Sequence, residues 1–173
     1  MKNPSGLNDE FMANLYDKVI GTVEEAVESM EEGDLYYGAV DASEFIRDKR
    51  TPKVIDPNIN RFRFVPADGG KETWLVNAGI HCVGLGAGST TVSGDYPYYM
   101  EKYINENANA NFIMIQGAEL AISSEYGENL VVDEALVAEY DQGYAELAAY
   151  GAKLGELTCS IEDSIKLDPI LNY

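Results

Sequence analysis

The sequence predicts an α/β fold in which a mixed β-sheet is flanked by helices. Segments with the pattern of strands alternate along the chain with segments of helical period, which favours this class over an all-α or all-β fold. One segment, 111–116, contains a run that is apolar on both faces, as a central parallel strand is. A chain of 173 residues can form one domain with a core. Because no internal repeat or low-complexity linker interrupts it, we expect a single domain over 1–173.

Three segments are predicted to be helices that flank the sheet: 8–32, 96–107 and 133–156. In the first, Asn8 can cap the start and Gly33 suits the end. Apolar residues recur there every three or four positions, which gives one apolar stripe. The stripe consists of Phe11, Leu15, Val19, Val23, Val27 and Met30. The inward stripe of the third helix is expected to hold Leu136, Tyr140, Tyr144, Leu147, Gly151 and Leu154.

The sheet is predicted to contain strands 35–40, 61–65, 73–83 and 111–116. Residues 68–70 read Asp-Gly-Gly, a hairpin signal that pairs 61–65 with 73–83 in the antiparallel sense. Strand 111–116 is expected beside 73–83 and parallel to it, through a right-handed crossover over helix 96–107. The segment 47–58 is interpreted as a connector, and the C-terminal tail can start one more strand.

The charge balance excludes some partners. Twelve Lys and Arg against 30 Asp and Glu give a net charge of −18, which repels nucleic-acid phosphates and anionic lipid surfaces. The short basic patch 47–50 is interpreted as a solvated turn. No apolar run approaches the ~18 residues that read as a membrane span, so we expect no transmembrane segment. The N-terminus has no apolar signal core, so the chain as written is expected to be cytoplasmic.

The two cysteines indicate no metal-binding motif. Cys82 and Cys159 stand apart, in neither CxxC nor zinc-ribbon spacing, so a structural zinc site is not expected. Their pattern favours two buried free thiols, and a single long-range disulfide stays open.

His81 is the only histidine, and it ends a predicted strand just before a glycine-rich loop. Alternation along 73–83 places Asn77 and His81 on one face and Cys82 on the other. The His81 face becomes small and polar, which leaves room for a ligand, although a lone histidine is usually a hydrogen-bonded structural residue. The loop is not a dinucleotide fingerprint, because Ser89 stands where its third glycine is needed and no helix opens directly behind it.

Two other residues have alternative readings. Ser123 follows the strand 111–116 and can act as a nucleophile if a base or metal lies near, or it can be an ordinary loop hydroxyl. Asp95 either caps the helix 96–107 or contacts the His81 imidazole from outside the site and so orients it.

Four segments in this order resemble the N-terminal catalytic domain of the neutral/alkaline (non-lysosomal) ceramidase family. The segments are LNDEFMANLYDKVIGTVEEAVESMEEGDLYYG, IRDKRTPKVIDPNINRFRF, NAGIHCVGLGAGSTTVSGDYPYYMEKYI and NFIMIQGAELAISSEY. The resemblance implies a zinc-dependent amidase that hydrolyses the N-acyl bond of ceramide or a related N-acyl lipid. It also implies that His81 is a zinc ligand, Ser123 the catalytic serine and Arg47 an arginine that lines the site. Members of this family are often secreted or membrane-associated.

The chain also departs from this family. The family's serine usually lies between Gly-Asp or Gly-Asn and a proline, whereas Ser123 follows Leu-Ala-Ile. The first histidine motif would lie upstream of residue 8, and the zinc glutamate and tyrosine beyond Tyr173. The chain therefore resembles the middle of such a domain, and the alternative to an amidase is a non-catalytic remnant or assembly module. We expect weak zinc binding, no turnover by the chain alone, convergence of His81, Ser123 and Arg47 on one cleft, and self-association through an open sheet edge.

Overall fold

The computed structural model describes residues 6, 8–86, 88–128, 130–139, 141–162 and 165–170. The chain divides into two compact units, residues 1–32 and 33–173, and each is described by itself. The first holds helix α1 (Asp9–Glu28), capped by the Asn8 side chain, which accepts a hydrogen bond of 3.0 Å from the Phe11 N–H. The predicted helix is confirmed, but it ends at Glu28 with Ser29 as its C-cap, and Gly33 begins a strand. No described residue of α1 is buried, so the packing of this helix on the sheet stays a prediction.

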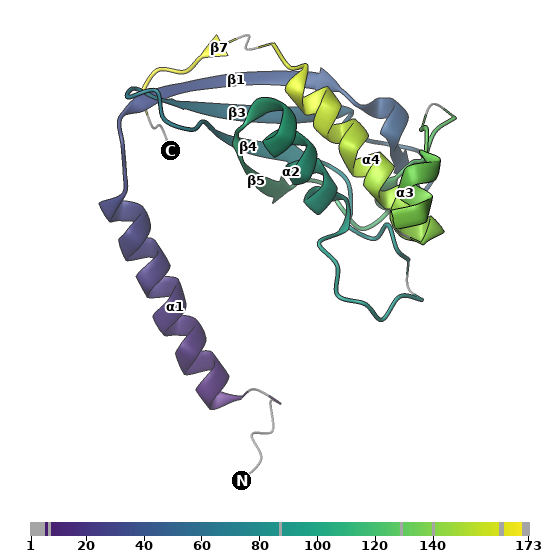
Figure 1. Cartoon of the computed structure of the whole chain (residues 1–173), viewed down its shortest axis with the longest axis horizontal. Helices are drawn as coiled ribbons and strands as arrows, with labels where there is room; N and C mark the ends of the chain where they lie inside the picture. The colour runs from purple at the N-terminus through teal and green to yellow at the C-terminus, as the bar shows by residue number, and fades with distance from the viewer. Residues whose placement is uncertain are drawn as a thin grey trace. The chain divides into compact units, whose positions relative to one another are not determined.

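The second unit is built on a five-stranded mixed sheet (Figure 1). Its order is β5-β4-β3-β1-β7. The strands are β1 (Gly33–Asp41), β3 (Asn58–Pro66), β4 (Thr73–Ala78), β5 (Asn111–Gln116) and β7 (Ile165–Lys166). β3 and β4 form the predicted antiparallel hairpin, and β5 lies parallel to β4 after helix α2 (Asp95–Ala108), as expected. β7 confirms the further strand in the tail.

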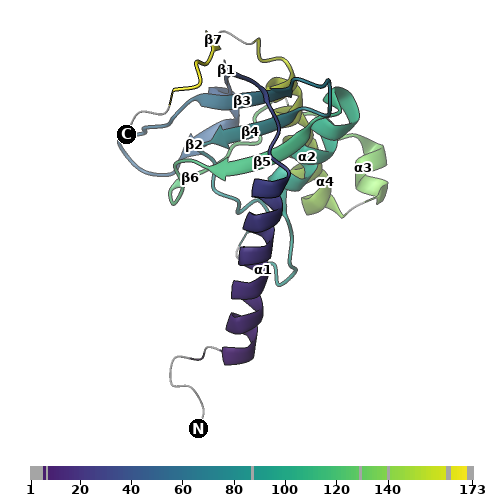
Figure 2. The ribbon, with the colours of Figure 1, turned by 90° about the vertical axis from the view of Figure 1, so that its left-hand side faces the viewer.

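Helices α2 and α4 (Gln142–Cys159) cover one face of this sheet (Figures 1 and 2). The single helix predicted over 133–156 is wrong, because the segment forms α3 (Glu134–Glu139) and then α4. Asp141 starts α4 as its N-cap, and its side chain accepts a hydrogen bond of 3.1 Å from the Tyr144 N–H. Tyr140, placed on the inward stripe by the sequence pattern, lies outside the described residues.

The core lies between the helices and the sheet. Trp74, Val76 and Ala78 of β4 point into it, and Tyr96 and Tyr150 are fully buried there. The hydroxyl of Tyr96 donates to the Ile80 carbonyl at 2.9 Å, and that of Tyr150 donates to the Phe45 carbonyl at 2.7 Å. Burial raises the pKa of both phenols, which therefore stay protonated donors.

The predicted strand 73–83 is too long. β4 ends at Ala78, whose carbonyl accepts a hydrogen bond from the Gly117 N–H at 2.9 Å, and the chain then leaves the large sheet. A separate two-stranded sheet follows from β2 (Ile46–Asp48) and β6 (Ile122–Ser124), with a 3₁₀ turn at Ser43–Phe45 before β2. The start of the segment interpreted as a solvated turn, 47–50, is thus part of a strand.

Candidate functional site

The three residues proposed for chemistry lie on neighbouring backbone segments. Arg47 of β2 is paired directly with Ser123 of β6. On the other side of β6, Ser123 forms a parallel bridge with His81, whose N–H donates to the Ile122 carbonyl at 3.1 Å. Residues directly opposite one another on adjacent strands carry their side chains on the same face. The small sheet therefore holds Arg47, Ser123 and His81 in a row.

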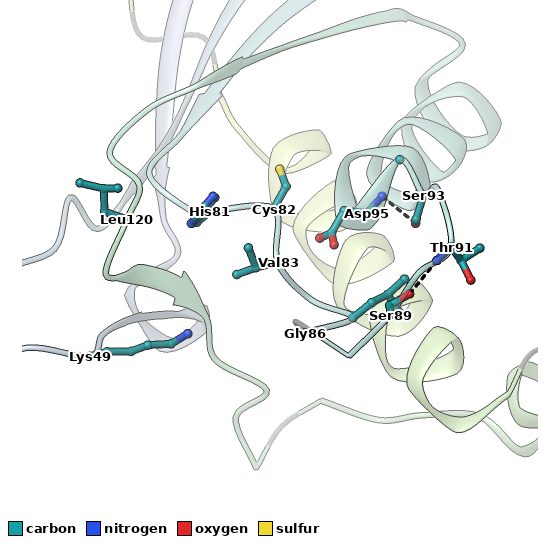
Figure 3. Close-up of a pocket in the computed structure, with 12 residues that line it drawn as sticks. Lys49, His81, Cys82, Val83, Gly86, Ser89, Thr91, Ser93, Asp95 and Leu120 are labelled. Carbon is teal, nitrogen blue, oxygen red and sulfur yellow. Dashed lines mark hydrogen bonds between the residues drawn. The ribbon is translucent and has the colours of Figure 1, made fainter. Parts of the chain in front are cut away.

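A cavity of about 590 Å³ lies beside this row (Figure 3). It is lined by His81 and other residues of the segment 81–95, together with Lys49 and Leu120. Figure 3 shows the Lys49 side chain and the Asp95 carboxylate on different sides of this space. The sequence reasoning missed Lys49, because 47–50 was interpreted as a turn. Lys49 follows directly after β2, and its N–H donates to the Ala121 carbonyl at 3.0 Å, a long-range contact that no local signal reveals.

Asp95 fixes the loop that follows His81. Its side chain is buried, and one carboxylate oxygen accepts the Gly84 N–H at 2.9 Å while the other accepts the Tyr96 N–H at 2.9 Å. Asp95 also adopts φ 53°, a left-handed conformation that side chains rarely take, so its contacts outweigh a local strain. It thus joins the start of α2 to the backbone three residues beyond His81. Among the described residues, its carboxylate bonds the Gly84 and Tyr96 N–H groups and not the His81 imidazole.

Gly84 is required for this close approach. A Cβ atom at this position would lie within 2.3 Å of Leu147 Cδ1, 3.0 Å of the Tyr126 hydroxyl and 3.2 Å of Asp95 Oδ1. The glycine-rich loop therefore packs closely against α4 and Asp95 at Gly84.

Ser123 is buried, with 2% of its surface exposed, and its hydroxyl has no hydrogen-bond partner among the described residues. A buried hydroxyl without a partner costs about 1–3 kcal/mol, and such groups are concentrated where a ligand or catalysis requires them. Ser123 does not line the 590 Å³ cavity, whereas His81 does.

The Arg47 side chain lines a different depression in the surface. Its Nε lies 3.1 Å from Glu125 Oε2, and both residues line a depression of about 240 Å³. About half of the Arg47 side chain is exposed, so the ion pair is screened by water and weak. The backbone thus brings the three residues together, while their side chains face separate spaces.

Asn77 and the cysteines lie outside this row. The Asn77 amide donates to the Ile115 carbonyl at 3.2 Å, and Asn77 does not line the cavity. Both cysteines are free, but the expectation that both are buried is wrong, since Cys82 is exposed and Cys159 is half-buried. Although Cys82 lines the cavity, desolvation and the nearby carboxylates raise the pKa of its thiol. Its thiol is therefore protonated near neutral pH when no metal is bound.

The described residues do not fit a zinc site by themselves. Within these ranges, no three His, Cys, Asp or Glu side chains gather closely enough to hold a metal ion. His81 offers one imidazole, and both carboxylate oxygens of Asp95 already accept backbone N–H groups. A catalytic zinc ion usually has three protein ligands.

The fold and the row of site residues define an α/β domain whose candidate site lies where the chain leaves the parallel strands β4 and β5. The structure of a neutral ceramidase from Pseudomonas aeruginosa matches 84% of this chain with a TM-score of 0.66 at 16% sequence identity. A second solved structure, a ceramidase complexed with C2, matches 80% with a TM-score of 0.56, also at 16% identity. These likenesses confirm the predicted ceramidase-like fold.

The match covers only part of those proteins. The chain spans about a quarter of their length, 25% and 23% respectively. No protein-family model matches the sequence, and no curated protein does. Among the described residues, no helix is both long and apolar enough to cross a bilayer.

Proposed function

We propose that this chain forms part of an amidase site of the ceramidase type, which hydrolyses the N-acyl bond of ceramide or a related N-acyl lipid. One observation carries the proposal. The residues that the resemblance assigns as zinc histidine, catalytic serine and site arginine are far apart in sequence, yet they are neighbours in the backbone pairing of the small sheet.

Each of the three side chains has a chemical role in such a site. Amide hydrolysis requires a nucleophile and stabilisation of the negative charge that develops on the carbonyl oxygen. The Ser123 hydroxyl has no competing partner, so it is available to attack or to orient a substrate group. The Arg47 guanidinium can stabilise the oxyanion once the weak pair with Glu125 opens. His81 can take the proton or hold a metal ion.

A zinc ion in such a site would polarise the amide carbonyl, but the described residues do not supply its ligands. We therefore expect zinc to bind the chain weakly and no amide turnover from the chain alone.

The second candidate is a non-catalytic module that keeps the fold. Ser123 is buried and does not line the cavity, which favours this candidate, because a substrate held in the cavity does not contact this hydroxyl.

Ligand titration followed by NMR separates the two candidates. Because the chain has one histidine, the His81 imidazole gives a single, unambiguous signal. Titrating the full chain with a short-chain ceramide is expected to shift this signal and the Gly84 amide. Ser123→Ala should weaken the effect several-fold, and the exposed control Ser160→Ala should leave it unchanged.

Stability measurements check that Ser123→Ala remains folded. Because removing a buried hydroxyl without a partner relieves its desolvation cost, this variant should be as stable as the parent or up to about 1 kcal/mol more stable. Equal shifts in the parent and Ser123→Ala, or no shift in either, would favour the non-catalytic module.

A further inference from the structure

The face of the large sheet that points away from α2 and α4 has an unusual composition. Alternation in β3 places Arg61 and Arg63 on the helix side and Phe62 and Phe64 on the other. Arg61 is 3% exposed on the helix side and donates to two carbonyls at the end of α4. A strand with one solvent-exposed face normally has its aromatic side chains on the buried face and its arginines on the exposed face. Here the order is reversed, which indicates that the Phe side is also covered.

The same face continues across the sheet, and we call it the open sheet face. It is defined by Leu35, Phe62, Phe64, Leu75, Ile113 and Ile115, which the strand registers place on one side. Leu35, Ile113 and Ile115 are 39%, 49% and 45% exposed. None of the six belongs to the core cluster or packs against it among the described residues. An apolar patch that runs over four strands is larger than scattered surface residues and marks an interaction site.

The open sheet face also lacks charge. Charged residues make up 24% of the chain, but along β1, β3, β4 and β5 this face carries only Asp41, at the end of β1. Its polar side chains bond within the sheet: the Tyr37 hydroxyl donates to Asn60 at 2.8 Å, and the Asn77 amide donates to the Ile115 carbonyl at 3.2 Å. Polar groups that are already satisfied can be removed from water at little cost.

We propose that the open sheet face is the contact surface between two copies of this chain, packed sheet against sheet. With a net charge of −18, two copies repel each other over most of their surfaces, and a face without charge is where they can approach. An apolar face is complementary to itself about a two-fold axis, and two sheets pack about 10 Å apart. The unpaired outer edge of β5 borders the same face.

The size of the face is sufficient for such a contact. Strand spacing and rise give a footprint of about 20 Å by 25 Å, or about 500 Å² for each copy. Two copies then bury about 1,000 Å² in total, which reaches the lower bound of a biological interface. Because side chains make the accessible area larger than the flat footprint, this figure is a minimum.

Sedimentation of the full chain over a range of concentrations tests the proposal. The parent should form dimers, and Ile113→Lys should weaken dimerisation at least tenfold, since the symmetry places the new charge in the interface twice. Val92→Lys is the control, because Val92 is fully exposed in a loop outside the sheet and the variant has the same net charge. Leu35→Lys, on another strand of the face, replaces Ile113→Lys if circular dichroism shows that the latter is unfolded.

Salt gives a second readout. Screening reduces the repulsion between the acidic copies, so added salt should strengthen the dimer. A dimer that salt weakens, or that Val92→Lys disrupts as much as Ile113→Lys, would overturn the proposal. A parent that stays monomeric would also overturn it. Flotation with zwitterionic vesicles that Ile113→Lys abolishes would then assign the face to lipid.

Discussion

The contact between Arg61 and the end of α4 provides the sharpest test of how this fold is held together. Arg61 Nη1 donates to the Thr158 carbonyl at 3.0 Å, and Nη2 donates to the Ile161 carbonyl at 2.7 Å. Its guanidinium also lies 4.3 Å from the centre of the Trp74 ring. The positive charge therefore bonds carbonyls in and just beyond the last turn of α4, at the negative end of the helix dipole, where the Thr158 carbonyl also accepts the Ile161 N–H at 3.3 Å. We predict that Arg61→Met destabilises the protein substantially.

The magnitude follows from these contacts. Each hydrogen bond from a charged donor contributes about 1.5–3 kcal/mol, and the ring contact contributes up to about 2 kcal/mol. Methionine avoids the cost of burying a charge, which offsets part of the loss. We expect a net loss of about 3 kcal/mol. Arg61→Lys keeps the charge but loses the planar pair of donors, so we expect about half of that loss.

Urea unfolding followed by tryptophan fluorescence measures this effect directly, because Trp74 is the only tryptophan and contacts the altered side chain. For a slope near 2 kcal/mol per molar urea, the midpoint should fall by about 1.5 M. The control is Arg63→Met, since Arg63 pairs with Glu72 at 3.1 Å where both side chains are partly exposed. It should cost no more than about 1 kcal/mol. Equal losses in the two variants would refute the role given to Arg61.

Two further predictions concern packing and pH. Gly151→Ala should destabilise the protein by about 2 kcal/mol, because the new Cβ would lie 2.5 Å from the Tyr96 carbonyl oxygen. Gly143→Ala in the same helix meets nothing closer than 3.6 Å and should stabilise the protein by about 0.5–1 kcal/mol. Thermal unfolding of both variants measures the contrast. The Asp48 carboxylate accepts hydrogen bonds from the Arg50 and Val54 N–H groups, which hold the pKa of its carboxyl below the ordinary 3.8. The ionised carboxylate therefore stabilises the folded state above about pH 4, and this contribution is lost as pH falls through the folded pKa. The difference in urea midpoint between the parent and Asp48→Asn should therefore be constant from neutral pH to about pH 5 and shrink below it; a difference that grows in acid would contradict this assignment.

The large sheet could be predicted from the sequence because its signals are local. The Asp-Gly-Gly turn at 68–70 favours the antiparallel β3–β4 pairing, and the helix between β4 and β5 supplies the crossover that a parallel pair needs. The break before α4 is also a local signal, since Asp141 is a good N-cap, but the continuous apolar stripe across 133–156 concealed it. Helical period alone therefore does not separate one long helix from two consecutive ones.

The small sheet could not be predicted in the same way. β2 and β6 have three residues each, too few for alternation to be recognised, and the pairing that stabilises them joins positions 76 residues apart, since Arg47 is opposite Ser123. The sequence pattern also did not reveal that Phe62 and Phe64 of β3 lie on the face away from the helices. Alternation divides a strand into two faces, but only the position of α4 decides which face is buried.

The proximity of His81 and Ser123 follows from the way the two parallel strands end. β4 and β5 run in the same direction, so both finish at the same edge of the sheet. The chain that leaves β4 reaches His81 within three residues, and the chain that leaves β5 reaches Ser123 after the turn through Leu120. These two exits then pair with each other, and β2 adds Arg47 from the other side. The direction of β4 and β5 therefore brings together three site residues that are distant in sequence.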